Sequence, residues 1–304
     1  MSPTYARLHD RGVLALAGED SRPFLQGLVS NDVMRVGPGR AIHAALLTPQ
    51  GKYLFDFCIG EDERGRLLLD AEAARLGDLQ RRLSLYRLRA KVSIDTDGAM
   101  AVYVIVGDGA AASLGLAGDD AGAAAPFAGG VAFVDPRLAA LGVRAILPAE
   151  GAGRALADRG LNAGDATQWD RLRLAFGIAD GSRDMQIEKS LLLEGGFDRL
   201  GGVDFNKGCY VGQELTARTR YRGLIKKRLM PVTVDGPLPP PETPVMVAGA
   251  NVGEVRSGRG DLAIVLLRND VLERTLAGEA ELTAANARLT PVIPEWAQAE
   301  QDPA

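Results

Sequence analysis

Cysteine and histidine are scarce in this chain, which holds two of each among its 304 residues. The cysteines, Cys58 and Cys209, lie far apart in the sequence, so a disulfide-rich scaffold is excluded. The histidines, at positions 9 and 43, are scattered as well, and the sequence offers none of the closely spaced pairs that hold structural zinc. We therefore expect no protein-bound metal.

Long apolar runs are also missing. The longest uncharged stretch, residues 121–134, consists mainly of small residues and contains Pro126, whereas a membrane-spanning helix needs about 20 strongly apolar residues. Residues 7–11 already carry charges of both signs, without the apolar core of a signal peptide or the acid-poor composition of a presequence. These features predict a soluble protein with no membrane partner in a reducing, cytoplasmic setting.

Positive charge is in short supply overall, since the net charge is −4 and the pI is near 5.4. This balance disfavours a protein that binds nucleic acid through its overall charge. The segment from 207 to 228 is the exception, with a net charge of +6 from seven cations against Glu214: Lys207, Arg218, Arg220, Arg222, Lys226, Lys227 and Arg228. Such a patch suits an anionic small ligand or a solvated face. An RNA-binding stripe is less favoured, because only two tyrosines interleave with the cations.

Hydrophobic patterning predicts a mixed αβ region followed by an all-β region, which makes the fold class α+β. The expected strands are at residues 13–17, 41–47, 53–59, 66–70, 101–106, 131–134 and 144–147, and the expected helices are near 21–28, 72–86 and 165–176. The Gly/Ala-rich stretch 108–130 lacks a phosphate-loop pattern, so we expect a small helix there. After position 228, short β-like runs separated by proline and glycine indicate a small barrel.

One segment carries the most chemical information: Lys207-Gly208-Cys209-Tyr210-Val211-Gly212-Gln213-Glu214, followed by Leu215-Thr216-Ala217-Arg218. Glycine before Cys209 leaves room for close backbone approach, and nearby cations favour the reactive thiolate. A single cysteine can equally be a small buried hydrophobe, and the residues alone leave both interpretations open. Cys58 lies in an apolar run, and we expect it to be buried.

This octapeptide closely resembles the signature of the YgfZ-type folate-binding proteins, which belong to the superfamily of the aminomethyltransferase (T-protein) of the glycine cleavage system. The mitochondrial iron–sulfur assembly factor of the same family carries a very similar octapeptide. Weaker patches of likeness lie at residues 24–33, 47–52, 86–92 and 169–177. The resemblance covers roughly residues 10–290.

The resemblance implies a multi-domain ring of two interleaved αβ subdomains plus a C-terminal small β-barrel. The folate-binding region is expected at 1–225, the barrel at 226–295 and a tail at 296–304. The implied ligand is tetrahydrofolate or another reduced folate. The implied partners are iron–sulfur scaffold, carrier or client proteins, and we expect a monomer.

The resemblance also suggests which residues act. Chemistry is assigned to Cys209, Lys207 and Asp56, and folate contact to Trp169, Arg173, Asp32, Tyr210 and Arg218, with Gly208, Gly212, Gln213 and Glu214 completing the motif. Each of four assignments has a structural alternative: Asp56 pointing to solvent by strand alternation, Asp32 as a turn or cap residue, Trp169 as core packing, and Arg173 in a salt bridge.

Two departures from the transferase branch weaken the case for an aminomethyl-transferring enzyme, although the resemblance leaves open whether the protein is an enzyme or an assembly factor. That branch has a pair of acids where this chain reads Phe55-Asp56, and it holds the pterin with a glutamate where this chain has Ala175. An alanine cannot grip the donor edge of a pterin as a carboxylate does. The sequence therefore favours a tetrahydrofolate-binding factor for assembly or repair of iron–sulfur clusters, acting through Cys209. The alternative is a folate-dependent aminomethyltransferase or demethylase that uses Asp56.

Overall fold

The computed structural model describes residues 2–223 and 225–298. The chain separates into two compact units, each built from several segments. Unit 1 comprises Met1–Pro49, Leu54–Trp169 and Leu200–Gln213, and unit 2 comprises Gln50–Tyr53, Asp170–Arg199 and Glu214–Ala304. The units are described separately.

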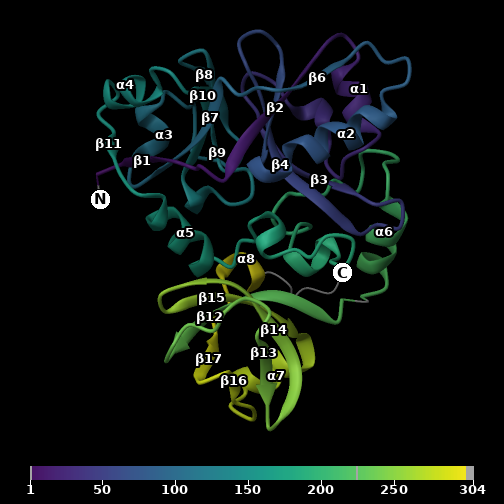
Figure 1. The fold of residues 1–304 in the computed structure, drawn as a ribbon, viewed down its shortest axis with the longest axis vertical. Helices are drawn as coiled ribbons and strands as arrows, with labels where there is room; N and C mark the ends of the chain where they lie inside the picture. The colour runs from purple at the N-terminus through teal and green to yellow at the C-terminus, as the bar shows by residue number, and fades with distance from the viewer. Residues whose placement is uncertain (1, 224, 299–304) are drawn as a thin grey trace. The chain divides into compact units, whose positions relative to one another are not determined.

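Unit 1 contains two β-sheets (Figure 1). The first has the order β3 (Ile42–Leu47), β4 (Tyr53–Glu61), β5 (Leu67–Glu72), β2 (Arg11–Ala17) and β6 (Ser93–Thr96). The second has the order β11 (Asn162–Ala163), β1 (Thr4–Arg7), β7 (Met100–Val106), β10 (Val143–Pro148), β9 (Gly130–Val134) and β8 (Ala124–Phe127). Strand β1 precedes the whole first sheet yet pairs with β7 in the second, so the two αβ halves interleave along the chain.

Short helices cover the two sheets of unit 1 and close their cores. Helix α2 (Leu76–Tyr86) buries Leu79 and Leu83, four residues apart on one face, against the first sheet. Helix α1 (Ser21–Gln26) begins after Asp20, whose carboxylate accepts a hydrogen bond from the Lys91 amide instead of capping the helix. Helices α3 (Ala110–Ser113) and α4 (Ala152–Ala157) pack on the second sheet, and α3 is the small helix expected from the Gly/Ala-rich stretch.

Unit 2 is built around a closed six-stranded barrel. Its strands are β12 (Lys227–Asp235), β13 (Pro244–Val247), β14 (Ala250–Arg259), β15 (Leu262–Arg268), β16 (Leu282–Ala284) and β17 (Ala287–Pro291), and helix α7 (Asn269–Leu276) follows β15. Alternating residues such as Val232, Val245 and Val265 fill the interior. The predicted fold class, α+β with a C-terminal small β-barrel, is confirmed.

The structure adds elements that the pattern analysis did not predict. Helix α6 (Gln213–Tyr221) forms within and after the octapeptide, and α8 (Glu295–Gln298) occupies the start of the predicted tail. The rest of that tail, residues 299–304, lies outside the described residues. Helix α5 (Ala166–Ala175) matches the predicted helix near 165–176. No helix within residues 2–223 and 225–298 is long and apolar enough to cross a membrane.

Candidate functional site

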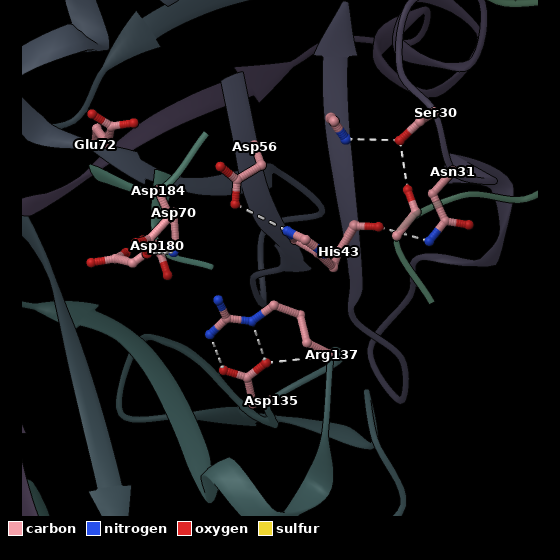
Figure 2. Close-up of polar contacts among 12 residues, drawn as sticks. Ser30, Asn31, His43, Asp56, Asp70, Glu72, Asp135, Arg137, Asp180 and Asp184 are labelled. Carbon is pink, nitrogen blue, oxygen red and sulfur yellow. Dashed lines mark hydrogen bonds and ion pairs between the residues drawn. The ribbon is translucent and has the colours of Figure 1, made fainter. Parts of the chain in front are cut away.

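The octapeptide begins in a loop of unit 1 that is fastened to the turn after helix α1. The Asn31 side-chain amide donates to the His43 carbonyl at 2.7 Å (Figure 2). It also donates to the Gly201 carbonyl at 2.7 Å, and the Ser30 hydroxyl donates to the Gly202 carbonyl at 2.6 Å. The Val211 amide donates to the Gly27 carbonyl at 3.2 Å. Two patches of family likeness, 24–33 and 207–214, are therefore held together by hydrogen bonds.

Lys207 acts as a further tether in this loop. Its ammonium donates to the carbonyls of Val29 at 2.6 Å and Asn31 at 2.7 Å, and it stands 5.2 Å from the ring centre of Tyr210. Burial lowers the pKa of Lys207 to about 8, although the Asp32 carboxylate favours the charged form. The charge of Lys207 is thus directed at carbonyls of the neighbouring segment, and its assignment to chemistry beside Cys209 stays a prediction.

Cys209 is exposed, whereas the next residue, Tyr210, is buried. Gly208 has a φ of +93°, which a residue with a side chain rarely adopts, and a Cβ there would meet no atom within 4 Å. Backbone conformation, and not a close approach as the sequence suggested, is thus the reason for glycine. This turn presents the thiol to solvent on a loop whose two ends are tethered, and of the two interpretations of Cys209 the buried one is wrong.

The second half of the motif belongs to helix α6. Thr216 and Thr219 face inward, whereas Glu214 in the first turn and Arg218 near the last turn are exposed. An acid at the start and cations at the end match the helix dipole. Gly212 directly before a Gln-Glu pair, with arginines a few residues later, is a helix start-and-stop signal that could have found α6 from the sequence.

Asp56 does not point to solvent, so that alternative is wrong. Its carboxylate lies 3.1 Å from Nε2 of His43 (Figure 2). Asp56 is on β4 and His43 on the neighbouring strand β3, and both side chains are buried. Burial lowers the pKa of His43, whereas the Asp56 carboxylate acts to raise it. The sequence analysis missed this pair.

A chain of five buried charges lies between the two sheets of unit 1. Asp70 accepts from Arg11 at 2.6 Å and also from Arg144. Arg144 also donates to Asp135 at 2.8 Å, and Asp135 accepts from Nε of Arg137 at 2.9 Å and from Nη2 of Arg137 at 2.6 Å. Because Arg11 and Asp70 belong to the first sheet and Arg144 to the second, the chain of charges joins the two halves of the unit. Sequence analysis identified none of its members.

Two of the residues predicted to contact folate, Trp169 and Arg173, contact other side chains of the protein. Trp169 is 3% exposed and has the Arg144 guanidinium 5.0 Å from its ring centre. Arg173 is fully buried in unit 2 and donates to Asp170 at 2.7 Å, to Asp184 at 2.9 Å and to Ser257 at 3.1 Å. As placed, the buried Trp169 ring offers no open face on which a pterin could stack, and the Arg173 guanidinium is engaged by Asp170, Asp184 and Ser257 instead of by a folate carboxylate. Core packing for Trp169 and a salt bridge for Arg173, the two structural alternatives, describe these contacts.

Two other predicted contacts lie in the motif region. The Asp32 carboxylate caps the short helix η1 (Val33–Arg35) by accepting from the Met34 amide at 3.1 Å, and it also accepts from Gln26 at 2.9 Å. These contacts account for Asp32 as a cap. Arg218 is exposed on α6 and Tyr210 is buried, and their assignment to folate stays a prediction.

Comparisons with known proteins point to one family. Residues 226–299 match the family model of the CAF17 C-terminal beta-barrel domain. The mitochondrial iron-sulfur cluster assembly factor IBA57 of Mus musculus is 33% identical over 315 residues, covering 96% of this chain and 85% of the mouse protein. Its human counterpart is 34% identical over 307 residues, covering 95% of this chain and 84% of the human protein. The chain belongs to the IBA57 family.

A solved structure shows the same fold as this IBA57-family chain. The glycine cleavage system aminomethyltransferase T from Bartonella henselae matches with a TM-score of 0.76, covering 99% of this chain and 87% of that chain at 15% identity. The predicted resemblance, an aminomethyltransferase-like fold closest to the iron–sulfur assembly branch, is confirmed.

The predicted cytoplasmic location is wrong, because the IBA57 relatives are mitochondrial proteins by name. The prediction rested on scarce cysteine and on the composition of residues 7–11. Scarce cysteine indicates a reducing setting, but it does not distinguish the cytoplasm from another reducing compartment.

The two thiols are expected to differ sharply in alkylation rate. Cys58 is buried on β4, and burial raises the pKa of its thiol to about 12, so both access and ionisation oppose reaction. In native protein at neutral pH, Cys209 should label readily and Cys58 only after unfolding. Mass spectrometry of Cys58→Ala and Cys209→Ser variants assigns each rate. Fast native labelling of Cys58 would contradict its burial.

Replacing Lys207 with methionine is expected to loosen the motif loop. The carbonyls of Val29 and Asn31 lose their charged donor, so the free energy of unfolding should fall by about 1–3 kcal/mol. Urea unfolding measures the change. The control is Lys226→Met, the same substitution at an exposed position of the basic segment. Equal effects of the two substitutions would show that the tether contributes nothing specific.

Proposed function

We propose that this protein is an iron–sulfur cluster assembly factor that acts through Cys209. The observation that carries the proposal is the exposed thiol on a loop tethered by Ser30, Asn31 and Lys207. A free surface thiol serves no packing purpose, and it is available to a partner or to an iron–sulfur cluster. Membership in the IBA57 family, whose curated relatives are named as iron–sulfur cluster assembly factors, supports the same function.

The number of ligands constrains how Cys209 can act. Iron–sulfur clusters are commonly held by about four cysteine thiolates. Among residues 2–223 and 225–298, no group of three or more His, Cys, Asp or Glu side chains could hold a metal ion. Cys209 therefore supplies one ligand at most, and the remaining ligands come from a scaffold, carrier or client protein. In this proposal the cluster is cargo that passes between proteins.

A reduced folate, tetrahydrofolate or a relative, is the proposed small-molecule ligand. The resemblance to a folate-binding family supports it, but Trp169 and Arg173 do not fit the contacts assigned to them. Titration calorimetry with tetrahydrofolate at low ionic strength should show saturable heat that weakens with added salt. Absence of heat and of a thermal shift would remove the ligand and leave the role of Cys209 untouched.

Aminomethyl transfer is the weaker candidate function. This function would depend on Asp56, whose carboxylate is buried and paired with His43. The chain also has Ala175 where the transferase branch has the glutamate that holds the pterin. Asp56→Asn distinguishes the candidates. An assembly factor should tolerate this change better than the loss of Cys209, whereas a transferase should show the reverse.

The assembly function is tested in a strain that lacks the protein. Several 4Fe–4S enzymes and one metal-free enzyme are assayed with and without a plasmid that carries the gene. We expect the iron–sulfur enzymes to lose activity together and to recover with the plasmid, while the metal-free enzyme stays constant. Unchanged iron–sulfur enzymes in the deletion strain would contradict the proposal.

A further inference from the structure

The last residues of helix α2 and the turn after it present apolar side chains to solvent. Leu85 and Leu88 are 73% and 89% exposed, and Tyr86 between them is exposed as well, although the other face of the helix is buried in the core. Single exposed apolar side chains are ordinary on protein surfaces, whereas a group of them marks an interaction site. We call residues 85–89 the α2 turn.

The backbone of the α2 turn holds Leu88 outward. Leu88 has a φ of +43°, in the left-handed region that a leucine seldom adopts. Hydrogen bonds close the turn on both sides, from the Arg87 amide to the Ser84 carbonyl at 3.2 Å and from the Ala90 amide to the Arg87 carbonyl at 2.8 Å. Backbone strain of this kind costs free energy and is concentrated at functional sites. The turn therefore maintains an exposed leucine that contributes nothing to the core.

The cations on either side of Leu88 are not neutralised. The side chains of Arg87 and Arg89 are exposed, and neither has an ion-pair or hydrogen-bond partner within the part of the chain that the structure describes. No acidic residue lies between positions 79 and 94 of the sequence. Two unpaired guanidinium groups that flank an exposed leucine complement a surface that combines carboxylates with an apolar pocket. Arginine and tyrosine are also the residues most enriched at the energetic centres of protein interfaces.

The small number of unpaired cations favours a protein over a membrane as the occupant. Anionic lipid surfaces are recognised by clusters of about four to eight Lys or Arg residues. Of the other cations nearby, Arg81 and Arg82 both pair with Asp78. Lys91 pairs with Glu19. The net charge of −4 also opposes the approach of the whole chain to an anionic lipid surface.

The α2 turn and the octapeptide loop are fastened to opposite ends of helix α1. At the start of α1, the Lys91 amide donates to the Asp20 carboxylate at 2.7 Å. At its end, the Gly27 carbonyl accepts from the Val211 amide at 3.2 Å. Six residues of α-helix are about 9 Å long, whereas a standard protein interface covers about 800 Å² of each partner. One docked protein is therefore large enough to cover both the α2 turn and the loop that carries Cys209.

We propose that the α2 turn docks the acidic surface of a partner protein, with Leu88 in an apolar pocket and Arg87 and Arg89 against carboxylates. The identity of the partner rests on the proposed function, since it is the scaffold, carrier or client protein that meets Cys209. The docking itself does not require Cys209 to be a cluster ligand.

Photo-crosslinking in living cells tests the docking without any iron–sulfur enzyme assay. The photoreactive amino acid p-benzoylphenylalanine is placed at position 86, where an aromatic ring is already exposed, and mass spectrometry identifies the protein and the peptide to which it links. We expect one dominant protein adduct, linked through a segment with a net negative charge. The control position is Leu276, an exposed leucine at the end of α7, which should not give this adduct. Lipid adducts alone, no adduct, or a link to a basic segment would overturn the proposal.

Paired substitutions separate charge from other effects. Arg87→Glu combined with Arg89→Glu should reduce the yield of the adduct at least about tenfold, because like charges then face each other. Arg87→Lys combined with Arg89→Lys keeps the positive charge and should retain most of the yield. Thermal unfolding should be the same in both variants, since both positions are exposed. Equal yields from the two variants would overturn the proposal.

The outcomes also distinguish this docking surface from the proposed function. A charge-dependent adduct, found together with unchanged iron–sulfur enzymes in the deletion strain, would reject the proposed function and support the docking surface. Loss of those enzyme activities, found together with an adduct that ignores the charge of the α2 turn, would support the proposed function and reject the docking surface.

Discussion

Cells that carry Cys209→Ser in place of the unmodified protein are expected to show iron–sulfur enzyme activities as low as cells without the gene. The substitution replaces one sulfur atom by oxygen at an exposed position, so the fold and its stability should not change measurably. A hydroxyl group does not ionise near neutral pH and is a poor iron ligand compared with a thiolate. The loss should therefore fall on function alone.

The control for that experiment is the other cysteine. Cys58→Ala removes a buried sulfur atom from the first sheet of unit 1, so it should reduce stability by about 1 kcal/mol and leave enzyme activities near normal. Thermal unfolding and protein levels are measured for both variants. Full activity with Cys209→Ser would refute a thiol-dependent mechanism. The motif loop would then be a binding surface only.

The fold could be predicted from the sequence because the patterns that indicate helices and strands are local. One such pattern is the helical spacing of Leu79 and Leu83, and another is the series of short β-like runs after position 228. Each pattern depends only on residues within one element. Helix α6 is not predicted by this helical spacing, because its inward-facing positions are two threonines, Thr216 and Thr219, instead of an apolar stripe.

The site could be predicted only where a short segment carries it. Cys209 stood out because an unusual octapeptide surrounds it. His43 and Asp56 are thirteen positions apart and face each other across two strands, so their pairing depends on sheet register that the sequence does not show. The contacts of Lys207 with the carbonyls of Val29 and Asn31 could not be predicted for the same reason, since these acceptors are more than 170 positions away in the sequence.

The buried charges of unit 1 are a second case in which the contacts of a residue cannot be predicted from its neighbours in the sequence. Arg11, Asp70, Asp135 and Arg144 lie in or beside apolar strands, where a charged residue is usually expected to face solvent. They are buried because each finds an opposite charge on a neighbouring segment. The pairs of Arg11 with Asp70 and of Asp135 with Arg144 depend on strand pairing within one sheet, and only the pair of Asp70 with Arg144 depends on how the two sheets pack. Burying them unpaired would cost far more than any local propensity could offset.

Arg144→Met is expected to lower the free energy of unfolding by about 3–5 kcal/mol, the range for breaking a buried ion pair. Arg144 has a 2% exposed side chain and joins Asp70 to Asp135, so its removal leaves two carboxylates underpaired between the sheets. It also removes the cation beside the Trp169 ring. Denaturant unfolding measures the loss. The control, Arg154→Met, removes an exposed pair with Asp158 and should change stability by less than about 1 kcal/mol.

The pH dependence provides an independent check on the same network. Burial alone would raise the pKa of Asp135, but the Arg137 and Arg144 guanidiniums outweigh it and hold that pKa well below its usual range. As the pH falls, Asp135 therefore takes up a proton at about pH 4 in the unfolded chain, and only at a lower pH in the folded chain. The stability from this group is therefore complete above about pH 4 and is lost as the pH falls toward the folded-state pKa. In Arg144→Met the pKa of Asp135 should rise, so stability should fall less steeply below pH 4. If the free energy of unfolding of Arg144→Met fell below pH 4 as steeply as that of the unmodified protein, Arg144 would not be what holds Asp135 in its charged form.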